Sequence, residues 1–140
     1  MVTRIVWLCF VLSLWQPMTL QAAPQIIVHP SVAVEKLSVA QLRSIFLMRQ
    51  LQWPNGAPIR VFVLTTQSAG HQQFSKECLQ LFPYQVERVW QKLTYSGIAT
   101  PPTELSSDMA MLEMISTTPG AIGYVEQYDE RYAAKVLPLQ

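Results

Sequence analysis

The chain has 140 residues, of which 50% are hydrophobic, and its ten Lys and Arg residues nearly balance nine Asp and Glu residues. This length holds one domain with one hydrophobic core and leaves no room for a second lobe of similar size. Because the formal net charge is +1 and no basic run occurs, neither nucleic acid nor an anionic membrane surface is expected as a partner.

Residues 1–23 have the pattern of a removable secretion signal. A basic start with Arg4 leads into an apolar run over residues 5–14, and the small residues Ala22 and Ala23 end the segment. The apolar run is well short of the roughly 20 residues that span a bilayer, so a permanent anchor is the weaker interpretation. We expect cleavage near Ala22 or Ala23, an exported protein, and a single domain over residues 24–140.

The two cysteines predict no internal disulfide in the exported protein. Cys9 lies inside the predicted signal, which leaves Cys78 as the single thiol of residues 24–140. Lipid attachment at Cys9 is the weaker alternative, because the apolar run continues beyond it. Cys78 shares a helical apolar stripe with Phe74 and Phe82, so we expect it to lie in the core and to take no part in redox chemistry.

The first half of the predicted domain alternates strands and helices. Residues 25–29 form an apolar run ended by a proline, which predicts a buried strand. Ser38 and Gln41 have the spacing of a capping box that opens a helix. The apolar face of this helix consists of Val39, Leu42, Ile45 and Phe46. The prolines and the Asn-Gly pair of residues 53–58 predict a turn, which leads into a β-branched strand over residues 59–64.

Two more helices are predicted after a polar loop at residues 65–71. The first has apolar residues at helical spacing, namely Phe74, Cys78, Leu81 and Phe82. The second starts at Pro83 and stops at Gly97. Its apolar stripe consists of Val86, Val89, Trp90 and Leu93.

An extended connector over residues 100–102 leads to a fourth predicted helix. Ser106 or Ser107 caps this helix, and Asp108 lies favourably near its positive end. Its inner face consists of Met111, Leu112 and Ile115.

Two strands complete the predicted domain. Residues 118–120 end the fourth helix, and residues 121–125 form a short strand. Residues 136–139 predict a last strand, which Pro138 keeps at the edge of the sheet. The order of strands and helices predicts an α/β fold, in which a mainly parallel sheet is covered by helices.

Hydrolytic or metal chemistry is hard to assemble from this sequence. The two histidines, His29 and His71, lie in no metal-spaced cluster, and no Gly-x-Ser-x-Gly nucleophile motif occurs. We therefore expect no enzymatic activity, no bound metal and no cofactor. His29 follows the first strand and is interpreted as a structural residue.

Bulky side chains elsewhere are interpreted as packing residues. Trp53 lies beside the predicted turn, and we expect it to anchor that turn in preference to the alternative of an exposed recognition aromatic. Met109, Met111 and Met114 are expected to fill space before any role in metal binding, and at most two of them can share the inner helix face.

The best candidate site is the loop from Thr65 to His71, where a strand passes to a helix N-terminus. Unpaired backbone N–H groups and the positive end of the helix dipole favour an anion at such a place. The residues expected to bind the anion are Thr65, Thr66, Ser68, Gly70 and His71, the last only when protonated. The alternative is that Ser68 merely caps the helix and the polar loop is solvated.

Several segments together resemble the substrate-binding proteins of phosphate ABC importers, and specifically their short, single-lobe periplasmic relatives. The matching segments run in family order and are residues 27–30, 37–46, 53–56, 90–97, 107–108 and 119–125. The resemblance implies one lobe of a type II periplasmic-binding-protein fold. The family's phosphate loop, roughly Arg-x-Asp-Gly-Ser-Gly-Thr, maps onto the loop Thr65 to His71. Thr65 stands where that loop has arginine and Gln67 where it has aspartate, so bidentate capture of phosphate by arginine is lost.

Two functions follow from this resemblance. The first is a periplasmic binding domain that holds phosphate or another small oxyanion weakly at the helix N-terminus. The alternative is a non-catalytic interaction module that has lost ligand binding and docks on a protein partner, such as a membrane transporter component or a sensor. The open face of a single lobe could also be covered by a homodimer. The export signal and the resemblance together predict the periplasm of a Gram-negative bacterium.

Overall fold

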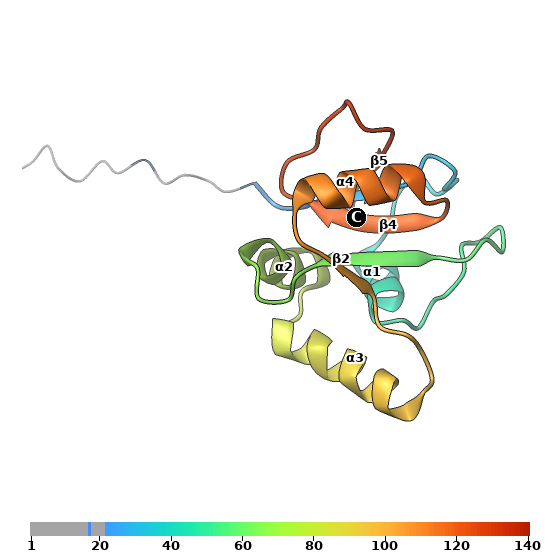
Figure 1. Ribbon diagram of the computed structural model, residues 1–140, viewed down its shortest axis with the longest axis vertical. Coiled ribbons are helices and arrows are strands. Elements are labelled where there is room, and N and C mark those ends of the chain that lie inside the picture. The colour runs from blue at the N-terminus through green and yellow to red at the C-terminus, as the bar shows by residue number, and fades with distance from the viewer. Residues whose placement is uncertain (1–16, 18–21) are drawn as a thin grey trace, which may run out of the picture.

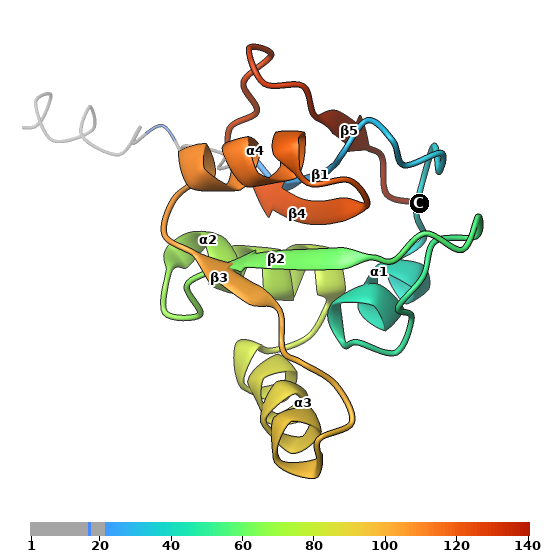
Figure 2. The same cartoon turned by 45° about the vertical axis from the view of Figure 1, so that its right-hand side comes forward.

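The computed structural model describes residue 17 and residues 22–140, so most of the predicted signal peptide lies outside the described residues. The described residues form a five-stranded sheet with helices on both faces (Figures 1 and 2). The strands are β1 (Gln25–Val28), β2 (Arg60–Leu64), β3 (Thr103–Leu105), β4 (Ala121–Val125) and β5 (Lys135–Leu137). The helices are α1 (Val39–Phe46), α2 (Ala69–Phe74), the π-helical turn η1 (Ser75–Leu79), α3 (Pro83–Ser96) and α4 (Asp108–Thr117).

The strand order in the sheet is β3-β2-β4-β1-β5. β2 pairs in parallel with both β3 and β4, whereas β1 is antiparallel to β4 and to β5. Four strands therefore point the same way, and β1 runs against them between β4 and β5. The predicted α/β class with a mainly parallel sheet is confirmed. The reversal of β1 could not be predicted, because an apolar run carries no direction.

The helices cover the two faces of the sheet in separate groups, and β4 shows which face each group covers. A Cβ added at Gly123 would lie 2.5 Å from Met111 Sδ and 3.2 Å from Ile115 Cδ1, both in α4. The next residue, Tyr124, points to the opposite face, as strand geometry requires. There its ring stacks on Phe74 of α2 at 3.7 Å between centroids and lies 6.1 Å from Phe46 of α1.

Helix α3 lies to one side of these layers (Figure 2). Two of its side chains, Val86 and Trp90, are buried. Trp90 Nε1 donates a hydrogen bond of 2.8 Å to the carbonyl of Phe46, the last residue of α1. The indole therefore fixes α3 to the rest of the domain, while most of the helix surface faces solvent.

The helix termini follow the predicted local signals. Ser38 and Gln41 form both hydrogen bonds of the capping box at the start of α1, with donor–acceptor distances of 2.9 and 3.1 Å. Gly97 ends α3 in the left-handed conformation. Ser107, and not Ser106, caps α4, because its hydroxyl accepts a hydrogen bond from the Ala110 amide at 3.1 Å.

The helix predicted to carry Phe74, Cys78, Leu81 and Phe82 is shorter than that pattern suggests. It passes from α2 into η1 and ends before Gln80, which adopts a left-handed conformation. Phe82 is extended and 59% exposed, so its predicted place on the apolar stripe was wrong. The reason is local, since the ring of Pro83 clashes with a helical conformation at the preceding residue.

One strand was missed by the sequence pattern. Residues 100–102 are the extended connector that was predicted, but the chain continues directly into β3, which pairs with Phe62, Val63 and Leu64 of β2. Its three residues show no apolar alternation, and a three-residue edge strand of this kind is recognisable only from its partner. β5 lies at the other edge of the sheet, as the proline that follows it predicted.

Candidate functional site

The loop Thr65–Ser68 leaves the carboxyl end of β2 and enters α2. The backbone N–H of Thr65 donates to the carbonyl of Leu105 at 3.1 Å, which ties the loop to the end of β3. The Ser68 N–H donates to the carbonyl of Thr65 at 2.8 Å and closes a tight turn. The loop thus lies at the edge of the sheet where ligands bind in open α/β folds.

Ser68 is the N-cap of α2. Its hydroxyl oxygen accepts a hydrogen bond of 3.2 Å from the backbone N–H of His71. This bond occupies one of the first-turn donors that an anion would otherwise contact. Ala69 and Gly70 carry the other first-turn N–H groups of this short helix.

His71 points into the core. Its side chain is fully buried, and its Nδ1 lies 2.7 Å from the hydroxyl of Tyr124. The oxygen of that hydroxyl accepts a hydrogen bond of 3.0 Å from the backbone N–H of Leu64. The hydrogen of the hydroxyl is then available to be donated to Nδ1. Among the described residues, His71 Nε2 has no hydrogen-bond partner. The imidazole was predicted to help bind an anion, but it does not reach the loop surface.

Burial lowers the pKa of His71, and the nearby Glu87 carboxylate opposes this effect. Burial also raises the pKa of the Tyr124 hydroxyl, so the phenol keeps its proton at physiological pH. The pair Tyr124–His71 is therefore a neutral, buried hydrogen bond. It supplies no positive charge to the loop.

A carboxylate of the chain itself lies beside the start of α2. A Cβ added at Gly70 would lie 3.2 Å from Glu126 Oε1 and 2.9 Å from Leu64 Cδ1. Gly70 is thus buried between a strand side chain and an acidic side chain. A negative group near a helix N-terminus is favoured by the helix dipole, and it repels a second anion at the same place.

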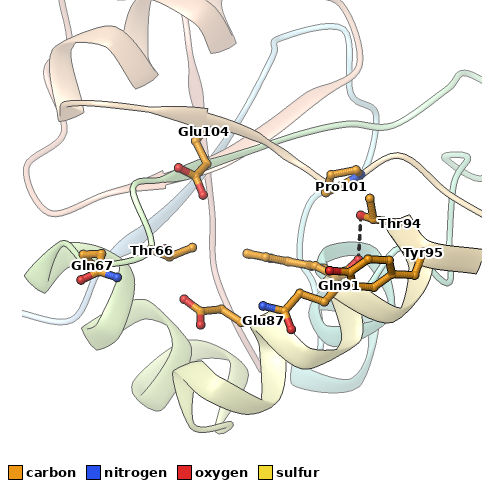
Figure 3. A pocket seen from close by; sticks show the side chains of 9 residues that line it. Thr66, Gln67, Glu87, Gln91, Thr94, Tyr95, Pro101 and Glu104 are labelled. Atoms are coloured by element: carbon orange, nitrogen blue, oxygen red, sulfur yellow. Dashed lines mark hydrogen bonds between the residues drawn. The ribbon is translucent and has the colours of Figure 1, made fainter.

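A cavity of about 510 Å³ opens between α3, the loop that follows β2, and β3 with the connector before it (Figure 3). Figure 3 shows Glu104 from β3 and Glu87 from α3 reaching into the same space. None of the described residues that line it is a lysine or an arginine. The lining residues are Thr66, Gln67, Glu87, Trp90, Gln91, Thr94, Tyr95, Pro101 and Glu104.

The structure brings only some of the predicted site residues together. Ser68 and His71 are joined through the helix cap, Thr65 contacts β3 through Leu105, and Gly70 is buried. Thr66 alone of the five lines the cavity. The predicted residues therefore surround one loop, but their polar groups do not converge on one point.

Most of the cavity wall was missed from the sequence. Glu87, Gln91 and Tyr95 recur at intervals of four, which places them on one helix face, and this spacing is a signal that was present in the sequence. Glu104 had no such signal, because only the pairing of β3 with β2 brings it to this place.

Trp53 anchors the turn beside it, as predicted. It is 4% exposed, and its Nε1 donates to the Gly120 carbonyl at 3.0 Å. His29 contacts Ser31 within a local turn, which agrees with a structural role. Of the methionines in α4, Met111 is buried, whereas Met109 and Met114 are exposed, so one of the three faces the core.

Cys78 lies in the core, as predicted. Its side chain is 3% exposed, and its thiol lies 3.6 Å from the carbonyl of Pro24. Burial raises the pKa of the Cys78 thiol to about 11, with a smaller contribution from Glu77. A thiol with such a pKa is a poor nucleophile at neutral pH.

Within the described part of the chain, no three His, Cys, Asp or Glu side chains gather closely enough to hold a metal ion. Among the same residues, no helix has both the length and the apolar character needed to cross a bilayer.

No family model matches the sequence, and no curated protein matches it either. Solved structures do match the fold. PstS from Borrelia burgdorferi aligns with a TM-score of 0.64 at 16% identity. A substrate-binding protein from Clostridium perfringens, solved with bound phosphate, gives 0.64 at 15%, and an ABC-type phosphate transport receptor from Vibrio cholerae gives 0.62 at 15%. Each alignment covers 84% of this chain.

The chain has the fold of one lobe of a phosphate-binding protein. It spans 44–47% of the length of these three structures. At 15–16% identity the likeness establishes the fold alone. In this chain, Ser68 caps α2 at the end of the loop after β2, and the carboxylates of Glu126, Glu87 and Glu104 lie near this loop.

Proposed function

We propose that the chain is an exported, non-enzymatic, single-lobe relative of the phosphate-binding proteins that acts in the periplasm as a protein-interaction module. Its partner is a membrane transporter component or a sensor. The observation that carries the proposal is the acidic character of the face that would hold the anion. Glu87 and Glu104 line its cavity, and Glu126 lies beside Gly70 at the start of α2.

The local charge disfavours retention of phosphate on this face. Tight binding of phosphate in proteins uses arginine forks, lysines or several convergent N–H groups. Here Thr65 stands where the resemblance expects arginine, the His71 N–H is bound to Ser68, and the His71 ring is buried. These features support an interaction role over solute capture.

Weak binding of phosphate or another small oxyanion at Thr65, Thr66, Ser68, Gly70 and His71 is the competing proposal. The first-turn N–H groups of Ala69 and Gly70 support it, because such groups have no partner within their own helix. The similar structure from Clostridium perfringens contains bound phosphate, which also supports oxyanion binding. The two proposals differ in what millimolar phosphate does to the protein.

A thermal-unfolding experiment with phosphate distinguishes them. A ligand at 100 times its Kd stabilises the folded state by about 2.7 kcal/mol, which raises Tm by several degrees. For residues 24–140 we expect no difference in Tm between millimolar phosphate and chloride at equal ionic strength. A phosphate-specific rise that Ser68→Ala changes would overturn the interaction proposal in favour of oxyanion binding.

The Ser68→Ala variant also tests the role assigned to the cap. Loss of an N-cap hydroxyl destabilises a protein by about 0.5–2 kcal/mol. We expect this loss of unfolding free energy in urea, with no change in any response to phosphate. Ser106→Ala is the matched control, because Ser107 and not Ser106 caps its helix, and it should leave the stability unchanged.

A further inference from the structure

The cavity between α3 and β3 carries negative charge that the described residues do not neutralise. Neither Glu87 nor Glu104 forms an ion pair among the described residues, where the acidic side chains with ionic partners are Asp129 and Glu35. Arg88, the sequence neighbour of Glu87, turns away and lies over the ring of Tyr84 at 5.8 Å. His71, close to Glu87, is held neutral by burial.

The wall between these carboxylates is aromatic and polar. Trp90 and Tyr95 both line the cavity, and the hydrogen bond from Trp90 to Phe46 holds the indole in place. The side chains of Gln67 and Gln91 add amide oxygens. A planar cation that stacks on aromatic rings and donates several hydrogen bonds matches such a wall, and guanidinium has both properties.

The rim of the cavity is open and partly apolar. Tyr95 is 91% exposed, and Pro101, which also lines the cavity, is exposed. Exposed aromatic and aliphatic side chains around a charged recess are typical of protein interfaces, where arginine and tyrosine are enriched. An open recess of this kind suits a side chain presented by another protein better than a free solute, which binding sites usually enclose.

We infer that the cavity between α3 and β3 receives the guanidinium group of an arginine side chain on the protein partner. The guanidinium lies between Glu87 and Glu104 and stacks on the aromatic wall. This inference rests on the proposed interaction function and names the chemistry by which the partner is recognised. It also accounts for the presence of carboxylates, and not of an arginine, on this face. An acidic cavity repels phosphate and attracts a basic side chain.

Site-specific photo-crosslinking in the periplasm tests the inference. A benzophenone amino acid replaces Tyr95 at the rim, and in a control protein it replaces Leu51, which is 51% exposed and lies outside the cavity. We expect an adduct from position 95 and none from position 51. The crosslinked segment of the partner should contain an arginine, identified by mass spectrometry of the adduct.

The carboxylates are then removed in the protein that carries the crosslinker. Truncating the charge opposite a buried arginine weakens a complex strongly, so Glu87→Gln with Glu104→Gln should reduce the adduct about tenfold or more. The matched control is Glu113→Gln, an exposed carboxylate of α4 outside the cavity, which should change the adduct by less than about twofold. Replacing the crosslinked arginine of the partner with glutamine should reproduce the loss. Circular dichroism confirms that each variant is folded.

The outcomes separate the two proposals. No adduct from position 95 in a folded, exported protein overturns the interaction function and the inference with it. An adduct that persists in the double variant, or whose partner segment has no arginine, overturns the inference alone.

In a parallel NMR titration, N-acetyl-arginine amide should shift the Trp90 indole and Gln91 amide signals, and N-acetyl-citrulline amide should not. If agmatine binds in the micromolar range and the amount of adduct is the same with and without the Glu87 and Glu104 carboxylates, the cavity is a site for a free cation and the inference is wrong.

Discussion

At the scale of single residues, His71 has the largest difference between expectation and structure. Its position after a Ser-Ala-Gly loop suggested a ligand contact, yet the imidazole is fully buried and pairs with Tyr124. No feature of the sequence near His71 predicts that its ring points into the core. It depends on Tyr124, which lies 53 positions later and arrives through β4.

Burial of His71 predicts a pH dependence of stability. Its folded pKa lies below the unfolded value of about 6.5, so below that pH the unfolded chain binds a proton that the folded chain resists. The unfolding free energy should therefore fall as the pH drops below about 6.5, by at most about 1.4 kcal/mol per pH unit. Urea unfolding of the wild type and of His71→Gln, at about pH 7.5 and at about pH 5.5, measures the difference.

His29→Gln is the control for this experiment, because the His29 ring is hydrogen-bonded to Ser31 in a local turn and is only half-buried. The His71→Gln variant is expected to lose part of the slope with pH, and His29→Gln is expected to keep it. Equal slopes in the wild type and in His71→Gln would contradict the assignment of the titration to His71.

At the scale of elements, local signals placed the helix starts and the turns well. The capping box of α1, the turn at residues 53–58 and the stop at Gly97 all occur where predicted, because each depends on contacts within a few residues. Elements that depend on distant partners were harder. β3 was missed, and the helix that begins with α2 ends earlier than its apolar spacing indicated.

Two glycines with positive φ make a matched test of the turn geometry. Gly56 has φ +86° with no atom within 4 Å of an added Cβ, whereas Gly120 has φ +75° and an added Cβ would collide with the Pro58 carbonyl. Gly56→Ala should destabilise by about 1–2 kcal/mol, the strain of a left-handed backbone. Gly120→Ala adds a backbone clash and should exceed about 3 kcal/mol in urea unfolding. Similar losses at both positions would show that the contact of Gly120 with Pro58 is unimportant.

At the scale of the whole molecule, the chain has the fold of about half of each of the three solved structures that it matches, since it spans 44–47% of their length. The alignment with each of these structures covers 84% of the chain. Glu87, Glu104 and Glu126 make the surroundings of the loop after β2 acidic.

The predicted signal peptide has a direct test in a Gram-negative host. The full chain of 15.9 kDa should be cut near Ala22 or Ala23, and the product should be recovered from the periplasm with the mass of the remaining residues. Leu8→Arg together with Val11→Arg interrupts the apolar run and should leave the precursor uncut in the cytoplasm. An uncut chain held in the membrane would instead support the anchor interpretation.

The sequence by itself determined the α/β class, the caps, the turns and the position of the polar loop, because these depend on periodicity and on contacts between near neighbours. Only the tertiary structure decided the direction of β1, the inward turn of His71 and the placing of Glu87 and Glu104 around one cavity. These features depend on strand pairings and side-chain contacts across many residues, in which several arrangements satisfy the same local pattern. The acidic cavity therefore depends on the topology. Helical spacing places Glu87, Gln91 and Tyr95 on one face of α3, and the pairing of β3 with β2 places Glu104 opposite that face.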